Sequence, residues 1–160
     1  MDAQDNIEAN RVNLQAICEQ AISSIIDHPQ RMPEQIQRLC QMLRTKVELK
    51  FPTSAYKSIG AFLFLRFISP SVLLSTTNGI VHARDLTSTP RSLMLIARVL
   101  TKLANEVQFM PHEKDFVFMN EFLTRNLPKL HKFYDTITVS VVCNSPKKDI
   151  LLTLVLCRLL

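Results

Sequence analysis

The segment Phe62–Ser71, with the sequence FLFLRFISPS, contains a single charged residue. Burying the ionised guanidinium of Arg66 without hydrogen-bond acceptors would cost several kcal/mol or more. Apolar residues on all sides of Arg66 predict a central helix enclosed by other helices, and the run is too short to span a bilayer. Pro70 predicts the end of this helix, with Ser69 outside the helical region. The pattern therefore predicts a fixed cation at the end of a buried helix.

Two roles fit such a cation. In a structural role, Arg66 would bond a carboxylate or the carbonyls of a loop, because buried arginines are nearly always paired. In a functional role, the same charge would belong to a site. The residues of this segment leave both roles open.

A second group of polar residues lies on a predicted helix that begins at the cap residue Thr89, with Pro90 first. Its members are seven, four and three residues apart, so they share one stripe of the helix: Arg91, Arg98, Lys102 and Asn105. The stripe predicts either a solvated face or a binding face.

The segment FLFLRFISPS resembles the signature of the domains that activate Ras-type small GTPases (RasGAP domains), which reads FLRF, two residues, then Pro-Ala. The matching residues are Phe64, Leu65, Arg66, Phe67 and Pro70, whereas Ser71 replaces the usual Ala and Ser69 a common Asn. The resemblance implies that Arg66 bonds main-chain carbonyls of the loop that carries the arginine finger. Phe64, Leu65 and Pro70 would set the position of Arg66.

The stretch PRSLMLIARVLTKLAN resembles the RasGAP helix that ends in Leu-Ala-Asn and presents a basic residue to the GTPase. Arg98 occupies the position where Lys is usual, and we expect Lys102 and Asn105 beside it at the GTPase. Because Arg and Lys differ in geometry and hydration, the contact need not transfer unchanged. Weaker resemblances lie in NRVNLQAICEQAISSI, in Lys50-Phe51-Pro52 and in MNEFLTRN.

The arginine finger itself has no counterpart in the pattern. Arg11 stands at the start of the first helical stretch, and Arg31 lies in the turn HPQRMP, far from the expected place. We therefore expect residues 1–138 to be the second half of a RasGAP catalytic domain, of neurofibromin-like or related type, without the finger half. Residues 139–160 would form an apolar tail of uncertain role.

Periodic apolar residues predict the elements that position these groups. The expected helices run from about Asn6 to before Pro29, from Pro33 to before Phe51, from Ser54 as cap through Arg66, from Thr89 to about Val107, from Pro111 to Asn126, and from Pro128 onward. The polar stretch 75–89 predicts a mobile loop. Only two glycines are present, which argues against β-sandwiches and barrels. We predict an all-α fold, an irregular helical array around the buried central helix.

The four cysteines form no CxxC pair, and the four histidines form no HExxH motif. We interpret the cysteines as reduced core residues of a cytoplasmic protein, and we expect no metal site. The net charge of +5 suits an acidic protein surface, anionic lipid or nucleic acid, and does not choose among them.

The resemblance implies binding of a GTP-loaded Ras-type small GTPase and stimulation of its hydrolysis, with weak activity for a chain that lacks the finger. The protein would regulate a reaction of its partner and would not itself be an enzyme. We expect no cofactor, because the GTPase would hold GTP and Mg²⁺, and no nucleic-acid partner. Recruitment to the inner face of a membrane would be indirect, through the GTPase. Two alternatives remain open: a GTPase-binding scaffold without catalytic effect, and a helical adaptor with no GTPase partner.

Overall fold

The computed structural model describes residues 3–74 and 89–139, and these contain helices and turns but no strand. The helices are α1 (Ala3–Ile26), α2 (Glu34–Glu48), α3 (Ala55–Gly60), α4 (Ser69–Leu73), α5 (Thr89–Ala104) and α6 (Asn120–Val139). Three 3₁₀ turns, η1 (Pro29–Arg31), η2 (Pro52–Ser54) and η5 (Val117–Met119), and the π-helical segment η3 (Ala61–Ile68) complete the order. The all-α prediction is confirmed. The predicted mobile loop, the apolar tail after Val139, Cys143 and Cys157 lie outside the described residues.

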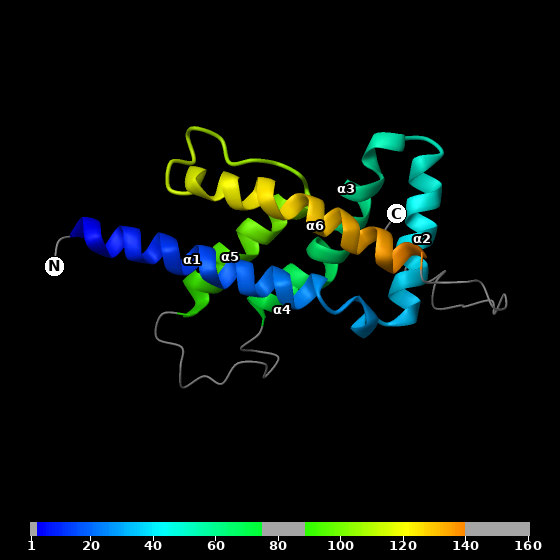
Figure 1. The fold of residues 1–160 in the computed structure, drawn as a ribbon, viewed down its shortest axis with the longest axis horizontal. Coiled ribbons are helices and arrows are strands. Elements are labelled where there is room, and N and C mark those ends of the chain that lie inside the picture. Colours follow the sequence, from blue (N-terminus) through cyan, green and yellow to red (C-terminus); the bar gives the residue numbers. More distant parts are fainter. Residues whose placement is uncertain (1–2, 75–88, 140–160) are drawn as a thin grey trace.

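The helices form an irregular array rather than a parallel bundle. Helix α1 packs against α5 and α6, and α2 packs against α3 and α6. Helices α2 and α3 lie at one end of the molecule, where α6 also ends, and α1 begins at the opposite end (Figure 1). Helix α4 packs against α5.

The core is built from the apolar stripes that the sequence predicts. Each side chain fully removed from water contributes roughly 1.5–3 kcal/mol relative to an exposed one. The largest fully buried side chains of the core are Ile22, Ile59, Leu63, Phe64, Val99, Leu100, Leu103, Met119, Phe122, Leu130, Tyr134 and Ile137. Cys18 and Cys40 are buried free thiols, as expected, and burial raises the pKa of each to about 12.

The central helix does not end before Pro70. Helix α3 continues through η3 into α4, and Pro70 lies in the first turn of α4. The backbone N–H of Ser69 bonds the carbonyl of Phe64, five residues earlier, which is the wider π-type turn. Because this turn is wider than an α-turn, the proline ring is accommodated without ending the helix. The predicted helix end at Pro70 is therefore wrong.

The prediction that Arg66 is buried is also wrong. Leu63 and Phe64 are buried, but the opposite face of η3 is open: Leu65 and Phe67 are each 42% exposed, and Arg66 is exposed. Arg66 forms no hydrogen bond or ion pair with the part of the chain that the structure describes. Water can satisfy its donors, so the physical need for a partner disappears.

Gly60 allows the central helix to approach its neighbours closely. A Cβ at this position would lie 2.4 Å from the backbone oxygen of Ala104 in α5 and 2.9 Å from the hydroxyl of Tyr134 in α6. Both distances are shorter than real Cβ contacts, so glycine is required here for packing. The hydroxyl of Tyr134 is buried and has no hydrogen-bond partner among the described residues.

The last third of the described chain also differs from the prediction. Residues 105–116 form turns instead of the start of a helix, and one helix, α6, runs through Pro128. Side chains on both flanks of the proline, including Leu123 and Leu130, are buried, and their packing outweighs a proline cost of about 3 kcal/mol. The turn is anchored to α6 because Asn120 accepts a hydrogen bond from the N–H of Phe109 at 2.8 Å and donates one to its carbonyl at 3.0 Å.

Ser54 makes no side-chain cap bond to α3, contrary to the expected cap. Among the described residues, no helix combines the length and hydrophobicity needed to cross a bilayer, and no group of three His, Cys, Asp or Glu side chains is placed to hold a metal ion.

Candidate functional site

Helices α4 and α5 enclose a groove of about 520 Å³. Its walls are held together by a hydrogen bond between the hydroxyls of Ser69 in α4 and Thr101 in α5, 3.0 Å apart. The lining residues are Ser69, Leu73, Met94, Ala97, Arg98, Thr101, Lys102, Asn105 and Val107. The structure therefore brings Arg98, Lys102 and Asn105, predicted from their spacing, into one groove.

The sequence of α5 explains why these side chains meet. Residues Met94, Arg98, Lys102 and Asn105 recur every three or four positions, which places them on one face of the helix. The other face carries Val99, Leu100 and Leu103, which are completely or almost completely buried. Burial of this apolar face turns the polar stripe toward the groove.

Glu113, in the turn before α6, bonds two of the three cations of the stripe, Arg98 and Lys102. Its carboxylate lies 2.6 Å from Nη2 of Arg98 and 3.0 Å from Nζ of Lys102. The same carboxylate accepts a hydrogen bond of 2.9 Å from the backbone N–H of Met110. Glu113 thus fixes the turn against α5 and holds both basic side chains at the edge of the groove.

Two phenylalanine rings lie against the cations of Arg98 and Lys102. The rings of Phe109 and Phe116 stack with centroids 5.1 Å apart. The guanidinium of Arg98 lies 4.6 Å from the centroid of Phe116, and Nζ of Lys102 lies 5.0 Å from that of Phe109. Cations at such distances from an aromatic face are attracted by the ring quadrupole.

The surroundings of Glu113 favour its ionised form. The N–H of Met110 and the cations of Lys102 and Arg98, in that order, lower the pKa of Glu113 to about 2. The carboxylate is therefore charged at neutral pH, and two cations face one anion. The excess positive charge resides beside the exposed apolar residues of the groove: Leu73 (45%), Met94 (62%) and Val107 (47%).

The side chains of Arg98 and Lys102 differ in their availability. Arg98 is 47% exposed and Lys102 23% exposed, although both bond Glu113. Lys102 also donates to the carbonyl of Gln108 at 3.4 Å. Arg98 can therefore meet a partner directly, while Lys102 serves mainly to fix the turn.

Of the signature segment, Ser69 lines this groove, whereas the residues that match the signature do not. Phe64 is buried in the core and Pro70 is partly buried, whereas Leu65 and Arg66 are exposed on η3. Arg66 precedes Ser69 by about one turn on the same continuous helix. The signature therefore lies next to the groove along this helix.

Comparison with known proteins decides the family. A family profile described as GTPase-activator protein for Ras-like GTPase (RasGAP) matches residues 1–105. The chain belongs to the RasGAP family. The match covers the signature in η3 and the whole of α5, so it includes Arg66, Arg98, Lys102 and Asn105. The neurofibromin-like subtype stays a prediction.

Curated relatives of this RasGAP chain have similar names. It is 33% identical over 137 residues to "GTPase activating protein BUD2" of Candida albicans, a match that covers 82% of this chain and 11% of that protein. It is 28% identical over 144 residues to "Probable Ras GTPase-activating-like protein ngap" of Dictyostelium discoideum, a match that covers 87% of this chain and 16% of that protein. It is 30% identical over 129 residues to "Ras GTPase-activating protein gap-2" of Caenorhabditis elegans, a match that covers 80% of this chain and 11% of that protein. The RasGAP chain thus spans only 11–16% of the length of these three relatives.

Sequence reasoning missed part of the groove. Met94 lies four residues before Arg98, so the same periodicity could have predicted it. Glu113 lies in an irregular turn, where no period links it to Arg98.

Proposed function

We propose that this RasGAP chain binds a Ras-type small GTPase in its GTP-loaded state through the groove between α4 and α5, and promotes hydrolysis of the bound GTP. The observation that carries the proposal is the convergence of Arg98, Lys102 and Asn105 beside three exposed apolar side chains. Such a surface, apolar at its centre with charge at its edge, is typical of protein interfaces. The names of the relatives support the choice of partner.

The chemistry would take place on nucleotide held by the partner. The GTPase would supply GTP, Mg²⁺ and the attacking water, and an activator acts by positioning groups and stabilising charge on the transferred phosphoryl group. Arg98 would bond an acidic group of the GTPase. Arg66 would bond carbonyls of an incoming finger loop, and its exposed side chain, which has no partner in the described part of the chain, leaves its donors available for that role. Its place in a π-helical segment fits, since such segments are frequent at functional sites.

We expect the 160-residue chain alone to activate weakly. For Ras and its activators, an arginine supplied in trans accelerates hydrolysis by about 10³–10⁵-fold, a value established for that system and not for this chain. The resemblance implies that this finger belongs to the half of the domain with no counterpart in the sequence. Glu113 holds Arg98, so Arg98 is poorly placed to substitute for the finger.

Single-turnover hydrolysis of GTP by a Ras-type GTPase tests the proposal. The chain and a longer protein carrying a RasGAP finger half would be compared in one assay. We expect weak acceleration by the chain and strong acceleration by the longer protein. Binding without acceleration by either protein would favour the scaffold alternative, and the absence of binding to any GTPase by a folded chain would favour the adaptor.

A further inference from the structure

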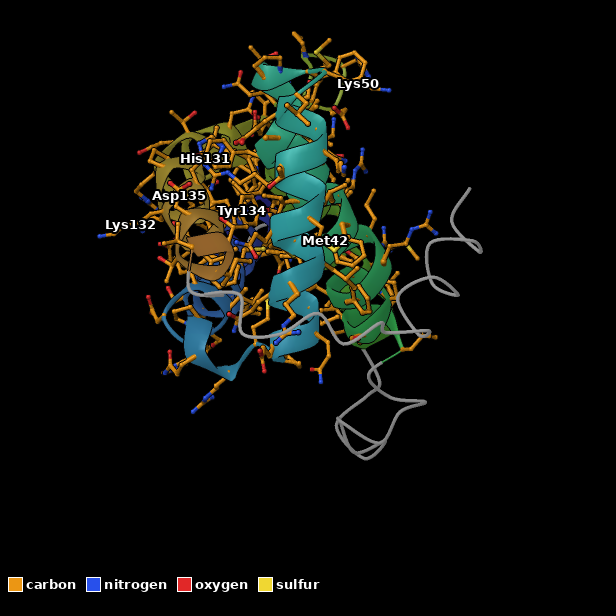
Figure 2. All side chains as sticks on the ribbon, turned by 90° about the vertical axis from the view of Figure 1, so that its right-hand side faces the viewer. Met42, Lys50, His131, Lys132, Tyr134 and Asp135 are labelled. Atoms are coloured by element: carbon orange, nitrogen blue, oxygen red, sulfur yellow. The ribbon has the colours of Figure 1, made fainter. Side chains whose placement is uncertain are left out.

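The turn between α2 and α3 carries the most exposed large apolar side chain of the described residues. Leu49 is 76% exposed, and Phe51, two residues later, is 62% exposed. Pro52 beside them is also exposed. We refer to residues 46–52 as the α2–α3 tip. The turn forms a corner of the molecule (Figure 1), and Lys50 lies at its outer edge (Figure 2).

Basic residues flank these apolar residues in the sequence. Residues 44–57 contain four basic side chains, Arg44, Lys46, Lys50 and Lys57, and one acidic one, Glu48. The carboxylate of Glu48 is bonded by Nε of Arg44 at 2.8 Å. Lys46 and Lys50 are exposed and form no ion pair with the part of the chain that the structure describes. Arg44 also bonds Asp135 of α6 at 2.6 Å, and Lys57 lies 4.0 Å from Glu106. The tip is therefore apolar at its centre, and its uncompensated positive charge comes from Lys46 and Lys50.

The backbone of the tip is held in place by hydrogen bonds. The N–H groups of Lys50 and Phe51 both bond the carbonyl of Val47, at 3.0 and 2.7 Å, and the N–H of Ser54 bonds the carbonyl of Phe51 at 3.0 Å. The side chains of Leu49 and Phe51 are thus held outward by an ordered turn. A surface that meets them need not order the turn first, which lowers the entropic cost of binding.

From this arrangement we infer that the α2–α3 tip docks on the surface of an anionic lipid bilayer. Leu49 and Phe51 would enter the interfacial region, and Lys46 and Lys50 would lie among the acidic headgroups. Apolar insertion together with basic attraction is the combination that binds peripheral proteins to such membranes. The inference does not depend on the proposed GTPase function, because the tip lies on other elements than the groove.

The absence of tryptophan from the sequence allows a local test. Phe51→Trp would place a single fluorophore at the tip, and Val12→Trp would place one on α1, where Val12 is 63% exposed. The full chain would be titrated with phosphatidylcholine vesicles, with and without phosphatidylserine, some carrying brominated acyl chains. We expect blue-shifted emission and bromine quenching for Phe51→Trp on phosphatidylserine vesicles only, and neither effect for Val12→Trp. Because the signal is local, it separates docking of the tip from vesicle binding by another part of the chain.

Charge variants give the second readout. Lys46→Ala/Lys50→Ala removes two basic residues from the tip, and the matched control Lys114→Ala/Lys132→Ala removes two exposed ones elsewhere. Each basic side chain near an anionic membrane raises the binding affinity about fivefold. The tip variant should therefore bind phosphatidylserine vesicles roughly 25-fold more weakly than the wild-type chain, and the control variant less than fivefold more weakly. An unshifted Phe51→Trp spectrum with a folded chain would overturn the inference, as would equal losses in both charge variants. A blue shift that depends on protein concentration without vesicles would also overturn it, by identifying the tip as a protein-binding surface.

Discussion

Nη2 of Arg98 lies 2.6 Å from the carboxylate of Glu113, and this pair joins α5 to the turn that precedes α6. The residues are fifteen positions apart in the sequence. The pair fixes Arg98 at the edge of the groove while leaving 47% of its side chain exposed. A partner that binds Arg98 must therefore share the guanidinium with Glu113 or displace Glu113.

Stability should depend on Glu113 in a pH-dependent manner. The pKa of Glu113 falls from its ordinary value of 4.5 to about 2 on folding, so its stabilisation is fully present above pH 4.5 and is lost as the pH falls toward 2. At pH 7, Glu113→Gln should lower the thermal midpoint by a few °C, on the order seen for the loss of one favourable interaction. The control Glu121→Gln removes an exposed carboxylate of α6. Thermal unfolding at several pH values checks this, and a difference between wild type and Glu113→Gln that persists undiminished at pH 2 would contradict it.

Exchange of the charges in the Arg98–Glu113 pair should separate its structural role from its binding role. Arg98→Glu places two carboxylates together and should destabilise the turn, whereas Arg98→Glu/Glu113→Arg should recover part of the lost stability. Both variants should bind the GTPase about five- to tenfold more weakly at low salt, with a smaller loss at high salt because exposed charges are screened. Thermal unfolding and calorimetric titration give the two readouts. Recovery of wild-type affinity by the double variant would remove Arg98 from the interface.

Arg66 should contribute to activation and not to folding. Its exposed side chain has no partner in the described part of the chain, so Arg66→Ala should change the free energy of unfolding by less than about 0.5 kcal/mol. In a longer protein with the finger half, the same variant should lower GTP hydrolysis while Arg31→Ala, which removes another exposed arginine, should not. Urea unfolding and single-turnover hydrolysis measure the two effects. A large loss of stability would restore the buried, paired role predicted from the sequence.

Gly60→Ala should destabilise the protein although alanine is the better helix former. Propensity alone favours alanine by about 1 kcal/mol, but the new Cβ would lie 2.4 Å from the oxygen of Ala104. Overpacking of this kind costs about 1–3 kcal/mol, so we expect a net loss in urea unfolding. Ser71→Ala, at an exposed position of α4, serves as the control. Equal or greater stability of Gly60→Ala would show that α3 and α5 can separate without cost.

The sequence predicted features that follow from one helical period and missed those that depend on contacts between elements. The positions of Arg98, Lys102 and Asn105 on α5 follow from their spacing, and the groove confirms that they share a face. The prediction that Pro70 ends the central helix failed because a π-type turn can accommodate a proline.

The errors at Arg66 and Glu113 have a related cause. Hydrophobic neighbours in the sequence predicted burial of Arg66, but burial depends on what packs against each face of the helix, and one face of η3 is open. Glu113 lies in a turn that was predicted to be helical, so its approach to Arg98 depends on the path of residues 105–116. Such paths are set by tertiary bonds, here those of Asn120 to Phe109.

Binding of a GTP-loaded GTPase to the groove is the central claim, and one titration tests it most directly. Ras-type GTPases loaded with a non-hydrolysable GTP analogue or with GDP would be titrated with the wild-type chain, with Met94→Asp in the groove and with Leu49→Asp in the α2–α3 tip. Met94 and Leu49 are both exposed, so both variants should fold. We expect binding to the GTP form only, a loss of at least tenfold for Met94→Asp, and no change for Leu49→Asp without membranes. Equal affinity of the wild-type chain and Met94→Asp for the GTP form would contradict the assignment of the groove.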